Sequence, residues 1–139
     1  MDLIIDGLNL VYKFPSTEER IYRDDLNGAK QNLISILDAY RKVSKLSSIQ
    51  IFWDGKKEKT DLNTFTEEIQ DMKIHYSHKQ KADDLMIHFL LYNEKPWQFT
   101  TVTSDKEILK VCRKLRSPHM TSEEFSAKVQ ESLGATNAL

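Results

Sequence analysis

Cysteine is nearly absent from this sequence, and so are long apolar runs. Cys112 is the single cysteine, so an internal disulfide is impossible and a zinc site would lack a second cysteine ligand. We predict that Cys112 is a buried thiol of the core. No stretch approaches the roughly 18 uninterrupted apolar residues that a membrane helix needs. The N-terminus, MDLIIDGLNL, lacks the charged start and the small-residue cleavage site of a signal peptide, so we expect a cytoplasmic protein.

An excess of charge of either sign is also missing. With 20 Lys and Arg against 21 Asp and Glu, the net charge is −1, which excludes a basic body that coats nucleic acid indiscriminately. A nuclease is compatible with this balance, because an acidic metal site and a basic rim for phosphates nearly cancel in the total. The 139 residues suffice for one sizeable core and not for two ordinary domains. We therefore predict one domain over 1–133 and a frayed tail over 134–139.

Strand and helix patterns alternate along the chain. Apolar runs rich in β-branched residues predict strands at 3–5, 49–53, 72–76 and 99–103. Apolar residues at helical spacing, or a capping-box-like start, predict helices over about 25–45, 62–70, 82–92, 108–115 and 121–133. Residues 14–24 read as a polar loop. The alternation predicts an α/β protein, a three-layer parallel sheet with helices on both faces.

Three predicted strands end in an aspartate, namely Asp6, Asp54 and Asp105. In an open parallel sheet the carboxyl ends of the strands lie on one edge, so these acids can converge in a single crevice. Asp83 and Asp84 open a predicted helix and add to the same edge. Carboxylates packed together repel one another, and a cation among them makes the arrangement tolerable. Oxygen ligands suit Mg²⁺ or Mn²⁺, and such a site suits phosphodiester hydrolysis by a metal-activated water.

A simpler explanation is that these aspartates only begin turns or cap helices, as aspartate commonly does. For any one position taken alone, that explanation is the stronger one. Asp54 has the weakest case for metal, because Asp-Gly is also an ordinary turn pair. The coincidence at three strand ends, with two further aspartates opening a helix, favours a metal site.

Four segments resemble the PIN-like NYN domain, specifically its YacP-like branch. They are IIDGLN at 4–9, IFWDG at 51–55, KADD at 81–84 and VTSDKE at 102–107. The resemblance covers about residues 1–133. It implies a PIN-like parallel sheet with helices on both sides, bound divalent metal and endoribonuclease activity, with one member of the family acting on messenger RNA at the ribosome.

The resemblance also implies roles for individual residues. By that resemblance Asp6, Asp83 and Asp105 are the principal metal-site acids, and Asn9 orients a water or a phosphate. The secondary acids are Asp54, Asp84 and Glu107. Many relatives have an aspartate where this chain has the longer Glu107, so the number of metal ions stays open.

Basic residues flank the proposed acidic edge, and the expected partner is single-stranded RNA. The residues expected to hold its phosphates are Lys13, Arg20, Arg23, Lys56, Lys57, Lys59, Lys79 and Lys81. Tyr12 and Phe14 suit stacking on unpaired bases, although packing of their loop onto the body is the better explanation. The four histidines lack metal-pair spacing, so we expect structural or solvent-facing roles for them.

Three functions compete on this sequence. The first is an endoribonuclease that depends on Mg²⁺ or Mn²⁺ and, as the resemblance implies, leaves 5′-phosphate and 3′-hydroxyl ends. The second is a non-catalytic RNA- or ribosome-binding module of the same fold, which would not benefit from carboxylates facing phosphates. The third is a phosphoryl-transfer or receiver-like domain, whose glycine loop and phosphoacceptor pattern cannot be assembled from this sequence. The sequence favours the nuclease.

Overall fold

The strands form one mostly parallel sheet in the computed structural model, which describes residues 2–45, 48–54, 65–77 and 81–134. The strands are β1 (Asp2–Asp6), β2 (Ser48–Trp53), β3 (Phe65–Ile69), β4 (Met72–Tyr76), β5 (Phe99–Val102) and β6 (His119–Met120). Their order across the sheet is β3, β4, β2, β1, β5, β6. All neighbours pair in parallel except β3, which pairs antiparallel with β4. The predicted α/β class is confirmed, and the antiparallel edge strand is an addition to it.

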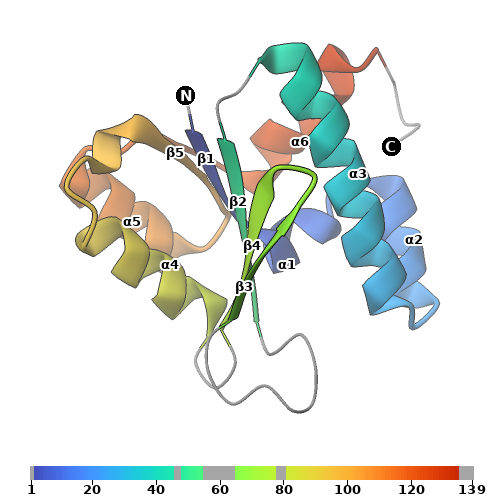
Figure 1. Cartoon of the computed structure of the whole chain (residues 1–139), viewed down its shortest axis with the longest axis horizontal. Helices are drawn as coiled ribbons and strands as arrows, with labels where there is room; N and C mark the ends of the chain where they lie inside the picture. The colour runs from blue at the N-terminus through green and yellow to red at the C-terminus, as the bar shows by residue number, and fades with distance from the viewer. Residues whose placement is uncertain (1, 46–47, 55–64, 78–80, 135–139) are drawn as a thin grey trace.

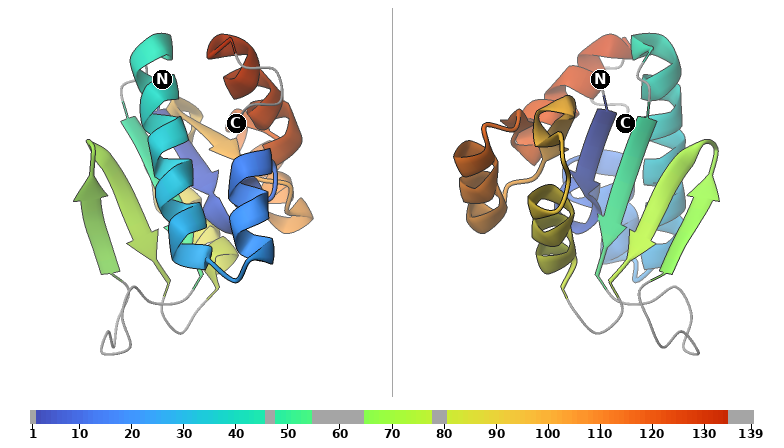
Figure 2. Two further views of the ribbon diagram at one scale, coloured as in Figure 1. Left: turned by 90° about the vertical axis from the view of Figure 1, so that its right-hand side faces the viewer. Right: turned by 60° about the vertical axis from the view of Figure 1, so that its left-hand side comes forward.

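Helices cover both faces of this sheet (Figures 1 and 2). They are α1 (Gly7–Val11), α2 (Pro15–Tyr22), α3 (Leu26–Ser44), α4 (Ala82–Leu91), the 3₁₀ turn η1 (Pro96–Gln98), α5 (Lys106–Leu115) and α6 (Ser122–Ser132). The first three helices and α6 lie on one face, while α4 and α5 lie on the other. Within the described ranges, no helix combines the length and apolarity needed to cross a membrane.

The central strands alternate between two hydrophobic cores. Leu3 and Ile5 of β1 pack with α1, α3 and α6, whereas Ile4 between them packs with α4 and α5. In β2, Trp53 belongs to the first core and Phe52 to the second. Because both faces of the sheet are covered, the strands read as nearly continuous apolar runs. Cys112 is buried in the second core, which confirms the predicted core thiol.

One predicted helix is a strand instead. The helix expected near 62–70 is wrong wherever the structure describes that range, because β3 occupies it. Gln70 and Asp71 have φ values of 51° and 63°, and two successive positive φ angles make a tight turn that matches the twist of an antiparallel hairpin. Pairing with β4 thus outweighs the local helical pattern. Residues 62–64 lie outside the described part of the chain.

The polar loop predicted over 14–24 is wrong as well, because most of it is helix α2. Pro15 opens this helix, where its fixed φ is favourable and its missing N–H leaves no partner unsatisfied. Phe14 is fully buried in the first core, which excludes base stacking for this side chain, whereas Tyr12 is exposed. At five and eight residues, α1 and α2 are too short to show a clear helical period in the sequence.

The other predicted helices are confirmed, as α3, α4, α5 and α6. The last one begins with the predicted capping box: the Thr121 hydroxyl accepts from the Glu124 backbone N–H at 3.1 Å, and the Glu124 carboxylate accepts from the Thr121 N–H at 3.2 Å. The two-residue strand β6 was too short to predict. Residues 135–139 of the predicted tail lie outside the described residues.

Gly7 allows the first turn of α1 to lie against the core. A Cβ added at this position would come within 2.8 Å of the ring of the buried Trp53. Gly7→Ala should therefore lower the free energy of unfolding by about 1–2 kcal/mol, because overpacking outweighs the better helix propensity of alanine. Urea denaturation would measure the loss, with Ser35→Ala on the exposed face of α3 as the control. An unchanged midpoint for Gly7→Ala would contradict this account of the contact.

Candidate active site at the carboxyl edge of the sheet

Two aspartates of the predicted site cap helices that begin at the carboxyl edge of the sheet. Asp6 ends β1 and caps α1, where its carboxylate accepts from the backbone N–H of Asn9 at 3.4 Å. Asp105 caps α5 and accepts from the backbone N–H groups of Glu107 at 2.9 Å and Ile108 at 3.1 Å. Both carboxylates are thus held by the positive ends of helices.

Asp54 reaches across to a third helix. It directly follows β2, and its carboxylate accepts from the backbone N–H of Ala82, the first residue of α4. This bond fixes the start of α4 beside the sheet edge and with it Asp83 in the first turn. The backbone N–H of Asp84 donates to the Asp83 carboxylate at 3.0 Å. The same aspartate side chains can therefore accept hydrogen bonds from helix starts and also lie together at the edge of the sheet.

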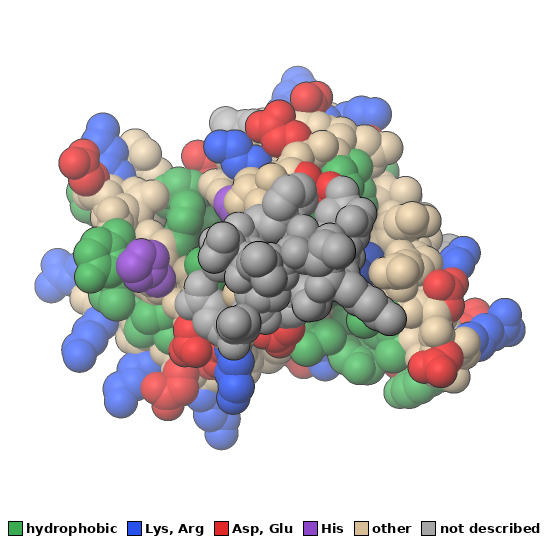
Figure 3. Space-filling model, turned by 60° about the horizontal axis from the view of Figure 1, so that its bottom comes forward, with side chains coloured by type: hydrophobic (Ala, Val, Ile, Leu, Met, Phe, Trp, Pro, Cys, Tyr) green, Lys and Arg blue, Asp and Glu red, His purple; other side chains and the backbone are tan. Residues whose placement is uncertain are grey.

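The structure brings the principal predicted residues to one cavity of about 270 Å³. Its lining residues are Asp6, Leu8, Asn9, Asp54, Lys81, Ala82, Asp83 and Asp105. We call it the acidic cavity. Figure 3 views this end of the molecule and shows acidic and basic side chains side by side there. Four carboxylates, an amide and a lysine from segments far apart in the sequence therefore share one cavity.

Burial and neighbouring charges perturb Asp6, which is 5% exposed. The pKa of its carboxyl group is raised from 3.8 to about 6, first by burial and then by the negative charges of Asp105 and Asp54. Hydrogen bonds from Thr103 and from the Asn9 backbone oppose the rise. A carboxylate that is desolvated and repelled in this way gains from a nearby cation.

Hydrogen bonds tie the segment after β5 to the segment after β1. The Thr103 hydroxyl donates to the Asp6 carboxylate at 2.9 Å and accepts from the Asp105 N–H at 3.0 Å. The Ser104 N–H donates to the side-chain oxygen of Asn9 at 3.1 Å. Thr103 is fully buried, and our sequence reasoning missed it although it lies within VTSDKE. Its position at a strand end, two residues before an acid, was the available signal.

The donor set of the acidic cavity fits a hard divalent cation. Carboxylate and amide oxygens are the ligands that Mg²⁺ and Mn²⁺ prefer. Over the ranges that the structure describes, no three acidic, histidine or cysteine side chains stand close enough together to hold a metal ion by themselves. Mg²⁺ sites commonly use one or two carboxylates and complete the shell with waters and substrate phosphate. The ligand assignment stays a prediction.

Two predicted secondary acids do not line the acidic cavity. Asp84 and Glu107 are both exposed, on the first turns of α4 and α5. Each takes part in the site through its backbone instead, because its N–H donates to the carboxylate of the preceding or capping aspartate. Their side chains therefore stand outside the acidic cavity.

The basic residues predicted to hold RNA do not all lie at the acidic cavity. Lys81 lines the acidic cavity and is exposed. Lys13 forms an ion pair with Glu123 at 2.8 Å, and this glutamate also accepts from the Ser104 hydroxyl at 2.8 Å. Together these contacts lower the pKa of Glu123 to about 2, with the Lys13 contact as the largest cause. The remaining lysines of the prediction lie outside the described residues, namely Lys56, Lys57, Lys59 and Lys79.

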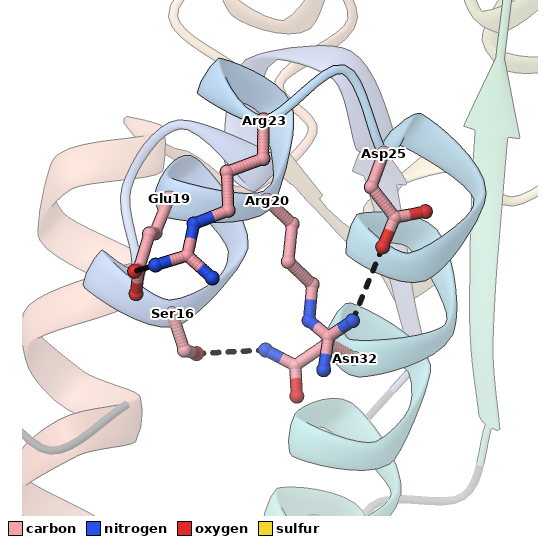
Figure 4. Close-up of a pocket in the computed structure, with 6 residues that line it drawn as sticks. All are labelled: Ser16, Glu19, Arg20, Arg23, Asp25 and Asn32. Atoms are coloured by element: carbon pink, nitrogen blue, oxygen red, sulfur yellow. Dashed lines mark hydrogen bonds and ion pairs between the residues drawn. The ribbon is translucent and has the colours of Figure 1, made fainter.

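Arg20 and Arg23 line a second cavity, of about 280 Å³, between α2 and α3 (Figure 4). It shares no lining residue with the acidic cavity. Arg20 pairs with Asp25 at 3.2 Å and Arg23 with Glu19 at 2.6 Å. Arg20 belongs to α2 and Arg23 is the residue that caps its C-terminus, and each guanidinium has a carboxylate partner.

Lys30 is a candidate functional residue that our sequence reasoning missed. This residue lies on α3, and its side-chain nitrogen is 4.9 Å from the ring centroid of Trp53 and 5.7 Å from that of Tyr76. Burial lowers the pKa of Lys30, and the negative charge of Asp54 raises it in part. Lys30 forms no ion pair with any described residue. No local pattern distinguished it from Lys42, the other lysine of the helix.

The sheet order, the helices on both faces and the acids at the carboxyl edge define a PIN-like fold of the nuclease type. Residues 3–137 match the YacP-like NYN domain, and the chain belongs to that family. The resemblance drawn from the sequence is thereby confirmed. The family supports nuclease activity at the level of the class of fold.

Two solved structures show the same fold. The crystal structure of Rae1 (YacP) from Bacillus subtilis is 16% identical, with a TM-score of 0.73 over 96% of this chain and 76% of that one. A mutant form of the same protein gives 14% identity and a TM-score of 0.73, over 96% of this chain and 77% of that one. At this identity the likeness concerns the fold alone. A search of curated proteins found no match.

Proposed function

We propose that this protein is a divalent-metal-dependent endoribonuclease. The observation that carries the proposal is the acidic cavity, in which Asp6, Asp54, Asp83 and Asp105 meet at the carboxyl edge of a nuclease-type fold. Burial of Asp6 among like charges is unfavourable for folding. Such an arrangement is typical of sites kept for chemistry rather than for stability.

The residues of the acidic cavity divide the work of such an enzyme. Of Asp6, Asp83 and Asp105, with Asp54 in support, one or two would bind Mg²⁺ or Mn²⁺ directly and the others through its waters. The ion would supply an activated water and neutralise charge on the phosphate. Asn9 uses its amide oxygen on Ser104, so its amide nitrogen is the group suited to a phosphate or a water. Lys81 at the rim suits a neighbouring phosphate.

The sheet-edge position of the site suits single-stranded RNA. We expect Lys81 and the lysines at 56, 57, 59 and 79 to contact phosphates near the cut. Arg20 and Arg23 can contribute only at a distance along the strand, because they line a separate cavity and each is paired with an acid. Lys13 likewise has an acidic partner.

Incubation of the purified protein with end-labelled single-stranded and structured RNA tests the proposal. Cutting should appear with Mn²⁺ or Mg²⁺, stop with EDTA and leave 5′-phosphate ends. RNA that is bound but never cut, with either metal, would contradict it and support a binding module of the same fold. Adding ribosomes loaded with messenger RNA tests the narrower expectation that the ribosome presents the substrate.

Lys30 offers a prediction about the affinity of the site for metal. Lys30→Met keeps an apolar stem over Trp53 and removes a positive charge near Asp54. Binding of Mn²⁺ should become tighter by a factor on the order of five, since one charge interaction of this kind is worth about 1 kcal/mol. Quenching of Trp53 fluorescence, in a Trp97→Phe background, would measure it.

The exposed Lys95, which lies just before η1, provides the matched control. Lys95→Met removes the same charge from the chain without touching the acidic cavity, so Mn²⁺ affinity should stay at the wild-type value. Unchanged or weaker binding in Lys30→Met would show that the ammonium of Lys30 does not act on the acidic cavity.

A further inference from the structure

A third cavity lies beside the first turns of α4, on the side of the helix that faces β4. It measures about 130 Å³. Its walls include Phe52, Thr66, His75, Leu85, His88 and Phe89, and we call it the ring pocket. Unlike the acidic cavity it contains no carboxylate among these residues, so its chemistry is that of aromatic and neutral polar groups.

Aromatic rings form the floor of the ring pocket. Phe52 and His75 stack with centroids 4.5 Å apart and planes at 25°, and Phe89 meets Phe52 edge-on at 5.7 Å. Phe52 is buried, whereas His75 and Phe89 are partly exposed. Flat rings at the bottom of a small cavity favour another flat ring system as the occupant.

His75 is held neutral and fixed in orientation. One ring nitrogen lies 2.8 Å from the Thr66 hydroxyl and the other 2.8 Å from the side-chain oxygen of Gln50. Burial, with the positive charge of Lys73, lowers the pKa of His75 to about 4. At neutral pH the imidazole therefore has no charge with which to attract a phosphate, and it offers its ring instead.

Two chain segments supply lining residues to both the ring pocket and the acidic cavity. In β2, Phe52 of the ring pocket comes two residues before Asp54 of the acidic cavity, a distance of roughly 7 Å along a strand. In α4, Leu85 comes two residues after Asp83, so the two side chains leave opposite sides of the helix and its start lies between the two cavities. The spacing between Phe52 and Asp54 along the chain is comparable to that between neighbouring nucleotides in an extended single strand.

We propose that the ring pocket accepts one unpaired nucleobase of the RNA whose neighbouring phosphate lies in the acidic cavity. The inference rests on the proposed function and adds to it a subsite that would set base preference beside the cut. Stacking on aromatic rings is the usual way in which proteins hold an unpaired base. The rim residues Thr66 and His88 are placed to contact the polar edge of that base.

Histidine ring signals of the whole chain give a test that needs no cleavage. Nucleoside 5′-monophosphates should shift the imidazole proton resonances of His75 and His88, which line the ring pocket, and leave those of His119 unchanged. One of the four bases should act at a lower concentration than the others. Equal shifts at all three histidines, or none at any, would overturn the base subsite.

RNA substrates with a single abasic residue test the same subsite during turnover. One abasic position next to the cut should raise KM about tenfold, while kcat changes less, because stacking contributes mainly to binding. Phe89→Leu keeps apolar volume but removes the ring, so it should raise KM for intact RNA and abolish the penalty at that position. Leu91→Ala, exposed at the end of the same helix, is the control.

The outcomes separate the two proposals. Metal-dependent cutting with the same rate at every abasic position would overturn the subsite and leave the nuclease standing. A protein that cuts no RNA would overturn the nuclease, and the histidine shifts would then decide the subsite alone. If Phe89→Leu does not fold, the exposed His88→Ala replaces it, with the same expected rise in KM.

Discussion

Asp6→Asn should reduce metal-dependent RNA cleavage on the order of 1,000-fold and, at the same time, make the metal-free protein more stable. The loss of activity follows from removing a negative charge that, in the proposed enzyme, would face the cation and the transition state. The gain in stability follows from burial, because the wild-type carboxylate is desolvated and repelled by Asp54 and Asp105. Asparagine keeps the shape of the side chain and an oxygen that can accept from Asn9.

The pH dependence of this gain has a definite direction. In the folded protein the pKa of Asp6 is about 6, above its ordinary 3.8, so the folded state binds a proton that the unfolded state has released between these values. Wild-type stability should therefore increase as pH falls from 7 to 4, by up to about 3 kcal/mol from this group. Asp6→Asn should lack that slope, so the two proteins should become equally stable near pH 4.

Urea denaturation in EDTA at pH 7, 5.5 and 4 would measure both proteins. Taking the difference between them cancels the other carboxylates that titrate in this range. Asp71→Asn, at the exposed turn between β3 and β4, serves as the control and should show no such difference. An Asp6→Asn protein that is less stable than wild type at pH 7 would mean that the hydrogen bonds to Thr103 and Asn9 outweigh desolvation.

Asp105 allows the charge of the site to be separated from helix capping. Asp105→Asn keeps an oxygen that can accept from Glu107 and Ile108, so we expect near-wild-type stability with cleavage reduced at least about 100-fold. Asp105→Ala loses both functions and should unfold more easily by about 1 kcal/mol. The hydroxyl of Asp105→Ser restores the cap but not the charge.

Melting temperatures and initial cleavage rates of these three variants give the comparison. Stability should follow the ability to cap, with alanine lowest, while all three should be nearly inactive. Should Asp105→Asn cut RNA at the wild-type rate, Asp105 would be a capping residue only. The same series at Thr121, which caps α6 away from the acidic cavity, should change stability without changing cleavage.

Much of the fold was readable from local patterns. The long helix α3 repeats an apolar period over enough residues to be distinct, and β1 and β2 are short apolar runs that stop at an aspartate. The cap of α5 at Asp105 and the capping box of α6 are also local, because each involves residues two or three positions apart. The short helices α1 and α2 escaped prediction because they span too few residues to show a helical period. The strand β3 escaped it because pairing with β4 outweighs its local helical pattern.

The candidate site divides in the same way. The sequence by itself determined that Asp6, Asp54 and Asp105 follow strands, since strand ends and turn residues are local signals. Only the tertiary structure shows that these residues both accept from helix starts and line one cavity. In it, the Asp54 carboxylate accepts from the first backbone N–H of α4, 28 residues further along the chain. The raised pKa of Asp6 likewise depends on burial, which no spacing in the sequence specifies.

Side chains outside the motifs show the limit most clearly. Lys30 and Arg20 are both cations near the start of the chain, and nothing local distinguishes them. In the structure Lys30 lies over Trp53 near Asp54, while Arg20 turns to Asp25 in another cavity. The sequence determined the fold class and the set of acids, because periodicity and strand ends are local. Only the tertiary structure decided which cations and rings accompany those acids, because that depends on helix packing across the sheet.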